Sequence, residues 1–308
     1  MKIVSYLSGI PPRNTNLQKP AILYNFIRGV NALGDEGVVH TGYDVVDSDV
    51  GVLQGFVHEF SQNMPHLALR RKVLDTQKQK GGRTVIVDSN LFLYANSDNP
   101  HDYLRYSFDG VFPSTGFYFD KEIDPSRWSK ISKDHNIALK DYRSWGTHIL
   151  LCLQRNGGWS MHGKNVMDFC HETINSIRQH SDRPIIVRGH PGDKKAKEYL
   201  KLNYPNVKIS PVGTPLQKDL HRAWATVVFN SSPGVASLVE GVPVFMMDPD
   251  PGFSQYSDVA NTKLKRLEDP KMFDRQQWIE RICMSHWKFH ELLSGEAWEH
   301  MRPYVYDQ

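Results

Sequence analysis

Two short turns in the second half of the chain carry residue types that bind phosphate. The first turn is the run RGHPGD at 188–193, and the second is the run NSSPG at 230–234. Each follows a short β-rich run and precedes a helical pattern, so each is predicted to join a strand to a helix. Helix N-termini carry partial positive charge and unpaired N–H donors, which attract anions. We therefore expect a phosphate-bearing ligand here, with a sugar nucleotide as the first candidate.

In the first turn, Pro191 restricts the backbone of His190 to non-helical conformations and directs its imidazole toward the end of the strand. The ring could donate a hydrogen bond to a phosphate or a proton to a leaving group. Arg188 could add positive charge beside it. An ordinary turn histidine is the alternative, and the serine turn in the same half of the chain favours the functional interpretation.

In the second turn, Ser231 and Ser232 precede Pro233 and Gly234, a pattern typical of a helix N-cap with proline in the first turn. Capping explains only one of the two serines. Two hydroxyls beside a glycine that allows close approach favour a turn that binds phosphate, with a purely structural cap as the alternative.

The first half of the chain offers two carboxylates. Asp88 ends the strand-like run Thr84–Val87 and could accept a proton from an acceptor hydroxyl; an Asx-turn is the alternative. Asp109 is a rival, although Asp109-Gly110 is also a common hairpin signal.

A third loop, at 154–158, opens with Gln154 and Arg155 and continues with two glycines, which suits a loop close to a ligand. It has neither the GxGxxG nor the Walker spacing, so dinucleotide and P-loop interpretations are weak. The 14 histidines form no HExxH motif and the three cysteines no CxxC. We therefore predict no metal site, no tightly bound cofactor and no need for a divalent metal.

A basic cluster lies upstream of Asp88. It consists of Arg70, Arg71, Lys72 and Lys78, continued by Lys80 and Arg83, against the single acid Asp75. Such a cluster is usually a solvated helix face. If it faces a cleft, it would favour a polyanionic acceptor such as double-stranded DNA or an acidic glycan.

Alternating strand-like and helical runs position these residues, and they predict an α/β fold with parallel sheets covered by helices. We expect a Rossmann-like acceptor domain at 1–143, a Rossmann-like nucleotide-sugar domain at 144–273 and a cleft between them. The tail at 274–308 is predicted to be helical and to pack back across the junction. Ligands of open α/β sheets bind outside the carboxyl ends of the strands, where both turns, Asp88 and Gln154 are predicted to lie.

Composition narrows the class of protein. A net charge of +3 over 308 residues is too small to predict nucleic-acid binding by the whole chain. The three cysteines show no paired spacing, as in reduced intracellular proteins. No apolar run is long enough to cross a membrane. We expect a cytoplasmic protein, in the host cytoplasm if a phage encodes it, and the oligomeric state is left open.

In these motifs, the chain resembles two-domain GT-B glycosyltransferases, in particular bacterial capsule-polysaccharide Kdo transferases and, more distantly, bacterial sialyltransferases. His190-Pro191 and Ser231-Ser232 match their His-Pro and serine motifs, and the run GVPV at 241–244 matches the strand that follows. Their acidic motif falls on Val87-Asp88-Ser89 and their glutamine turn on Gln154. The similarity is at the level of motifs and spans 84–247.

The resemblance implies that Asp88 is the catalytic carboxylate and that His190, Ser231 and Ser232 hold the donor phosphate. The family has glycine where Ser89 stands and a glutamate where Ala236 stands, so the nucleotide remains open between CMP and UDP sugars. The expected activity is sugar transfer to an acceptor hydroxyl, either on hydroxymethylated bases of phage DNA or on a capsule or cell-surface polysaccharide. A sugar-nucleotide epimerase and a non-catalytic sugar-nucleotide binder are the alternatives of another class.

Overall fold

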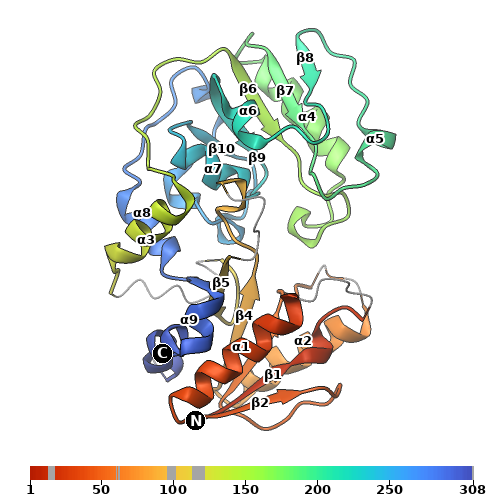
Figure 1. Cartoon of the computed structure of the whole chain (residues 1–308). Helices are drawn as coiled ribbons and strands as arrows, with labels where there is room; N and C mark the ends of the chain where they lie inside the picture. Colours follow the sequence, from red (N-terminus) through yellow and green to blue (C-terminus); the bar gives the residue numbers. More distant parts are fainter. Residues whose placement is uncertain (13–17, 60, 62, 96–101, 113–121, 307–308) are drawn as a thin grey trace. The chain divides into compact units, whose positions relative to one another are not determined.

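The computed structural model describes residues 1–12, 18–59, 61, 63–95, 102–112 and 122–306 (Figure 1). The chain forms two compact units. Unit 1 consists of Met1–Arg127 and Arg281–Gln308, and unit 2 of Trp128–Glu280. Each unit is a sheet covered by helices, which confirms the predicted α/β class with two Rossmann-like units.

Unit 1 is built on a six-stranded sheet in the order β11-β5-β4-β3-β1-β2. The first four strands along the chain run parallel, whereas β5 is antiparallel to β4 and β11 is antiparallel to β5. The strand-like run Thr84–Val87 that the sequence predicted lies within β4. The strands are β1 (Lys2–Tyr6), β2 (Glu36–His40), β3 (Val50–Gln54), β4 (Arg83–Asp88), β5 (Tyr103–Phe108) and β11 (His286–Lys288).

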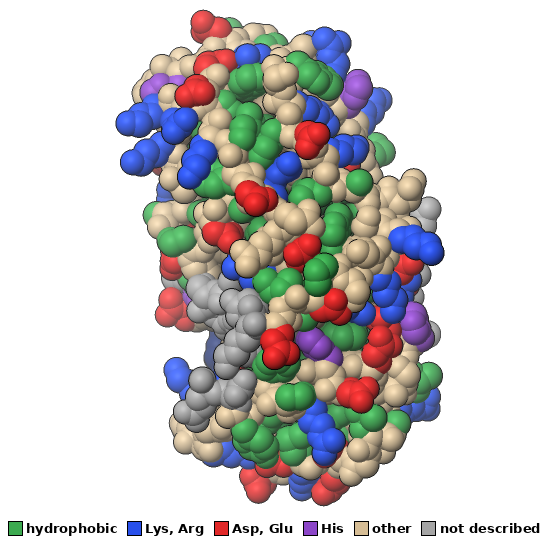
Figure 2. All heavy atoms as spheres, turned by 90° about the vertical axis from the view of Figure 1, so that its left-hand side faces the viewer, with side chains coloured by type: hydrophobic (Ala, Val, Ile, Leu, Met, Phe, Trp, Pro, Cys, Tyr) green, Lys and Arg blue, Asp and Glu red, His purple; other side chains and the backbone are tan. Residues whose placement is uncertain are grey.

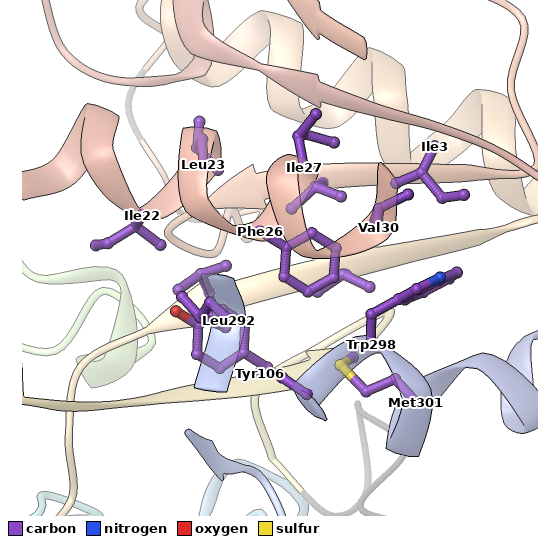
Figure 3. Packing of buried hydrophobic residues seen from close by; sticks show 14 of the residues in the cluster. Ile3, Ile22, Leu23, Phe26, Ile27, Val30, Tyr106, Leu292, Trp298 and Met301 are labelled. Atoms are coloured by element: carbon purple, nitrogen blue, oxygen red, sulfur yellow. The ribbon is translucent and has the colours of Figure 1, made fainter. Parts of the chain in front are cut away.

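The C-terminal segment completes unit 1. Its strand β11 extends the sheet, and its helices α9 (Phe289–Ser294) and α10 (Glu296–Met301) pack on α1 (Gln18–Ala32). Trp298 and Met301 lie in the same buried cluster as Phe26 of α1 (Figure 3). A Cβ at Gly29 would lie 1.9 Å from the carbonyl oxygen of Leu292, so only glycine permits this approach of α1 to α9. The tail therefore includes a strand and belongs to the core of unit 1.

Unit 2 is built on a parallel sheet in the order β10-β9-β6-β7-β8. Its central strand is buried along its whole length, as expected for a parallel strand covered on both faces. The strands are β6 (His148–Cys152), β7 (Ile185–Arg188), β8 (Val207–Ile209), β9 (Ala223–Val228) and β10 (Val244–Met246). The helices within or at the border of this unit are α3 (Pro125–His135), α4 (Val166–Arg178), α5 (Ala196–Tyr199), α6 (Leu216–Leu220), α7 (Pro233–Val239) and α8 (Gln276–Cys283).

The division of the chain differs from the boundary predicted at 143/144. The segment before β6 belongs to unit 2 because its backbone is bonded there: the N–H of Lys140 donates to the carbonyl of Val239, and that of Arg143 to the carbonyl of Gly241. The segment is rich in polar and charged residues, and the predicted boundary assigned it to the end of the first domain. Its carbonyl at Lys140 also accepts a hydrogen bond from the Arg275 guanidinium at 2.7 Å, which ties it down further.

Candidate functional site

All five strands of unit 2 run parallel, so their carboxyl ends lie at one edge of the sheet. The His190 turn follows β7 and the serine turn follows β9, with β6 between these two strands. Neighbouring strands are about 4.8 Å apart, so the two turns are on the order of 10 Å apart. The edge that the sequence predicted for both turns is the edge at which they lie.

The ring of His190 is fixed by its own turn. Its Nδ1 accepts a hydrogen bond from the N–H of Gly192 at 3.0 Å, so in the neutral ring the proton is on Nε2. Burial, and then the positive charge of Arg155, lower the pKa of His190. His190 is therefore a neutral imidazole near pH 7 that offers one N–H donor. This makes it a hydrogen-bond donor to an anion rather than a counter-charge.

Asp193 holds this turn in shape. Its Oδ2 accepts a hydrogen bond from the N–H of Asn156 at 3.0 Å and another from the Tyr199 hydroxyl, while Oδ1 accepts one from the N–H of Lys195 at 3.1 Å. Burial acts to raise the pKa of Asp193, but these hydrogen bonds outweigh it and the pKa is lowered. The loop after β6 and the turn after β7 are joined through this carboxylate. The helix predicted from Lys194 begins only at Ala196, because Asp193 and Lys195 complete the turn first.

The two serines of the second turn differ. Ser232 occupies the N-cap position of α7 in a helical conformation and makes no capping bond with its side chain, and it is exposed. The hydroxyl of Ser231 is buried without a hydrogen-bond partner in the part of the chain that the structure describes. Neither hydroxyl caps the helix, so a purely structural capping role does not explain the two serines.

Gly234 is buried against an aromatic ring. A Cβ at this position would lie 2.3 Å from Cζ of Tyr256, whose hydroxyl donates to the carbonyl of Ser231 at 2.7 Å. The N–H of Gly234 donates to that same carbonyl at 3.0 Å. The close approach that Gly234 allows is thus to Tyr256, which fixes the serine turn.

A network of polar side chains beneath the serine turn was missed by the sequence analysis. Asn230 donates from Nδ2 to Oδ2 of Asp248 at 2.5 Å and to the carbonyl of Ser160 at 3.1 Å. Gln154, which is 5% exposed, donates from Nε2 to Oδ1 of Asn230 at 2.8 Å and to the Ser160 hydroxyl at 2.6 Å. Gln154 is thus a support for Asn230 rather than a group in open contact with ligand.

Asp248 anchors the far end of this network. The side chain of Asp248 is fully buried, and its Oδ2 lies 3.2 Å from Nε2 of His162. Burial raises its pKa, against hydrogen bonds from the N–H of Asp250 and from Asn230. Its signal in the sequence was its place directly after a buried strand, the same signal that identified His190.

A cavity of about 580 Å³ opens beside His190, on the side of β8. Arg188 lies at its wall, but its guanidinium is bonded to the carboxylate of Asp219, which also accepts a hydrogen bond from the Ser210 hydroxyl at 2.7 Å. Arg188 is therefore neutralised by Asp219. The cavity is lined by Arg188, Gly189, His190, Pro191, Asp193, Lys194, Ala196, Lys197, Leu200, Ile209, Ser210, Pro211, Val212 and Gly213.

In unit 1, Asp88 ends β4 at the carboxyl edge of the sheet, as predicted. Oδ2 lies 3.1 Å from Nη2 of the buried Arg105, and Oδ1 accepts the N–H of Ser89 at 2.7 Å. The side chain keeps 27% of its surface exposed. Asp88 is thus oriented by two donors and remains open to a ligand.

Asp109 does not lie with Asp88. It directly follows β5, which runs antiparallel to β4, so it lies at the opposite end of β4 from Asp88. There its carboxylate accepts the N–H of Thr84 at 2.7 Å and pairs with Arg83 at 2.9 Å. Its φ of 63° suits a turn. Asp109 is a structural residue, and its assignment to the cleft was wrong.

The predicted basic cluster is not one surface. Arg70 is buried, and Arg71 donates to the carbonyl of Ser61 at 2.6 Å, whereas Lys72 and Lys78 are exposed. The helical period of α2 (Pro65–Gln79) explains this, because it turns neighbouring cations to different sides. On the face that Figure 2 shows, acidic and basic side chains are interspersed over most of the surface.

Within the described ranges, no group of three or more histidine, cysteine, aspartate or glutamate side chains is arranged to hold a metal ion. No helix in those ranges has both the length and the apolar character needed to cross a membrane.

No protein-family model matches the chain, and no curated protein matches it. Among solved structures, it is similar to Thermosulfurimonas dismutans KpsC, beta Kdo 2,4 transferase, with a TM-score of 0.55 and 14% identity over 92% of this chain and 90% of that chain. It is also similar to Thermosulfurimonas dismutans KpsC, beta Kdo 2,7 transferase, with a TM-score of 0.53 and 12% identity over 96% of this chain and 98% of that one. The resemblance to capsule Kdo transferases is confirmed in fold.

Proposed function

We propose that this protein is a glycosyltransferase that moves a sugar from a nucleotide-activated donor to an acceptor hydroxyl. One observation carries the proposal. The His190 turn and the serine turn, distant in the sequence, lie at the same carboxyl edge of the unit 2 sheet. That edge is where open α/β sheets bind ligands, and two proteins of this fold are named as Kdo transferases.

In unit 2 the proposed task is to stabilise the leaving phosphate. When the bond between the anomeric carbon and the phosphate oxygen breaks, the bonding electrons leave with the phosphate. Neutral donors placed in advance stabilise that charge, and this is usually the largest contribution to catalysis. His190 offers Nε2–H, and the exposed hydroxyl of Ser232 offers a second donor. The buried hydroxyl of Ser231 offers a third where a ligand reaches it.

In unit 1 the proposed task of Asp88 is to accept the proton of the acceptor hydroxyl. Its carboxylate is oriented by Arg105 and by the N–H of Ser89, and it retains exposed surface. A general base within reach of the proton that it removes contributes roughly 10²- to 10⁴-fold to rate.

A glycan is the acceptor that the surface of this chain favours. The DNA interpretation depended on a continuous basic face at 70–83. Arg70 is buried and donates to the carbonyl of Gly9, and Arg71 donates to the carbonyl of Ser61, so neither belongs to such a face. The names of the two fold relatives favour Kdo, an acidic sugar, as the sugar that is transferred, and the nucleotide stays open between CMP and UDP. We further propose that transfer needs no divalent metal, since His190 and the serines supply the donors.

Thermal unfolding with a panel of CMP, UDP, GDP and dTDP tests the donor half of this proposal. The correct nucleotide should stabilise the protein by about 2.7 kcal/mol at a hundredfold excess over its dissociation constant. His190→Ala should weaken that effect, while Lys263→Ala, an exposed control in unit 2, should not. If none of the four shifts the unfolding temperature, the proposal is wrong.

Incubation with the matching nucleotide sugar and no acceptor separates transfer from epimerisation. An epimerase converts the sugar without a partner, whereas a transferase leaves it intact apart from slow hydrolysis. Conversion to an isomer at a steady rate would replace the proposal with the epimerase alternative.

A further inference from the structure

The carboxyl edge of the unit 1 sheet holds a buried cation that the mechanism above does not use. Arg70, on α2, is only 6% exposed. Its Nε donates to the carbonyl of Gly9 at 2.8 Å and its Nη1 to the carbonyl of Phe56 at 3.3 Å. These carbonyls follow β1 and β3, so the guanidinium lies where those two strands end.

The backbone around Arg70 leaves room for the guanidinium. Gly55 has a φ of +92°, a conformation that side chains rarely adopt. A Cβ there would lie 2.7 Å from Nη1 and 3.1 Å from Nη2. Any other residue at 55 would therefore displace the guanidinium from the strand ends.

The charge of Arg70 is not neutralised. Arg70 forms no ion pair in the part of the chain that the structure describes, and its Nη2 makes no hydrogen bond there. The acid that acts on it is Asp88, and the ion pair of Asp88 is with Arg105. Among the described residues, the two buried guanidinium groups of Arg70 and Arg105 thus share the carboxylate of Asp88, which leaves one positive charge in excess. Burial lowers the pKa of Arg70 to about 10, so it is still protonated at pH 7.

A second polar group without a partner lies one helical turn away. His66 precedes Arg70 by four positions on α2, so both side chains are on the same side of the helix. Its Nδ1 is buried and has no hydrogen-bond partner in the described ranges. Burial, and then the charge of Arg70, lower its pKa and keep the ring neutral at pH 7. The first turn of α2, a helix of 15 residues, contains no acidic residue that would offset the positive end of its dipole.

An uncompensated buried cation is costly, by several kcal/mol in real proteins, unless an anion accompanies it. A neutral hydrogen-bond donor would be enough to bind the two loop carbonyls that Arg70 contacts, so this contact does not explain the positive charge. A guanidinium, in contrast, matches the planar fork of a carboxylate and the oxygens of a phosphate. The arrangement of Arg70, His66 and the start of α2 is therefore that of a site for an oxyanion.

We propose that Arg70, assisted by His66, binds a carboxylate or phosphate group of the acceptor at the carboxyl edge of the unit 1 sheet, close to Asp88. The assignment to the acceptor rests on the proposed function. The site would select acceptors that carry an acidic group near the reacting hydroxyl, and it would hold that hydroxyl near the base.

Isothermal titration of the full chain, without nucleotide, with glucuronate, its neutral methyl ester and inorganic phosphate tests the site. Glucuronate should bind at least about tenfold more tightly than the ester, as expected for a charge-assisted bond. Phosphate should compete with it, and phosphate binding without glucuronate binding would assign the site to a phosphate. Equal binding of acid and ester, or no binding of either anion, would overturn the proposal.

Variants locate the site. Arg70→Gln should weaken glucuronate binding at least about tenfold, and His66→Ala should weaken it to a smaller extent. Arg28→Gln, which removes an exposed arginine of α1, should leave it unchanged.

Nucleotide binding by unit 2 tests the proposed donor site independently of the anion site, and in a variant it also shows that the chain is folded. If the wild type binds no nucleotide, the anion test is still valid. If Arg70→Gln does not fold, His66→Ala and the comparison of acid with ester decide the matter. Unchanged glucuronate binding in a folded Arg70→Gln variant would contradict the assignment.

Discussion

The carboxyl edges of the two sheets use different chemistry. In unit 2, the edge is held together by hydrogen bonds among Gln154, Asn230 and Asp248, and it presents a neutral imidazole and a hydroxyl. In unit 1, the edge is built from charges, with Arg70 and Arg105 buried beside Asp88. Neutral donors in fixed positions suit a phosphate whose charge grows during reaction. Charges suit proton acceptance and the selection of an acidic partner.

The largest expected effect comes from removing the carboxylate of unit 1. Asp88→Asn should lower the rate of transfer by roughly two to four orders of magnitude, because a general base is lost. Nucleotide binding, assigned to unit 2, should be unchanged. Asp75→Asn, an exposed aspartate on α2, is the matched control and should retain full activity. Near-normal turnover by Asp88→Asn would remove Asp88 from the mechanism.

The stability of unit 1 should depend on its C-terminal segment. Trp298 is 1% exposed and packs near Phe26 (Figure 3). Its Nε1 donates a hydrogen bond to Oδ2 of Asp35 at 2.8 Å. Trp298→Ala should lower the free energy of unfolding by about 3–5 kcal/mol. Leu293→Ala, on the exposed side of α9, should change it by about 0.5 kcal/mol or less. Similar losses in both variants, measured by urea denaturation, would show that the segment is not part of the core.

A smaller effect is expected on the pH dependence of stability, because His190 at the carboxyl edge of unit 2 is neutral. The pKa of His190 in the folded protein is lower than its ordinary value of 6.5, chiefly because the ring is buried. As the pH falls below 6.5, the unfolded chain takes up a proton that the folded chain does not, so stability from this residue is lost. His190→Asn keeps an acceptor for Gly192 but does not titrate. The stability of the wild type relative to this variant should therefore fall as the pH is lowered through and below about 6.5; a constant difference would contradict the neutral assignment.

The smallest expected effect concerns metal. Because His190 and the serines are proposed to stabilise the leaving phosphate, an excess of EDTA should leave the rate of transfer unchanged. A rate that falls with EDTA and returns with Mg²⁺ would show that unit 2 needs a cation in addition to its neutral donors.

The sequence was most informative where one strand leads directly into one turn. The positions of His190, Ser231 and Asp88 at strand ends followed from short apolar runs with polar residues after them, and the structure places all three there. The reason is physical: a buried parallel strand must leave the core at its carboxyl end, and polar side chains collect at that point.

Contacts between residues that are far apart in the chain could not be predicted from the sequence. Nothing local predicts that β11 joins β5. The partners of Asp109 and Asp248 were likewise missed, because Arg83 and Asn230 are brought to them only by the sheet. Composition placed the domain boundary in a polar segment, and backbone hydrogen bonds to unit 2 place it elsewhere.

The central claim is that His190 and the serine turn hold the same phosphate. A double-mutant cycle measures this directly, with the dissociation constant of the nucleotide determined for the wild type, His190→Ala, Ser232→Ala and the double variant. Two side chains on one phosphate should show a coupling energy of about 0.5–3 kcal/mol. Strictly additive losses, or no loss from either single variant, would contradict the account.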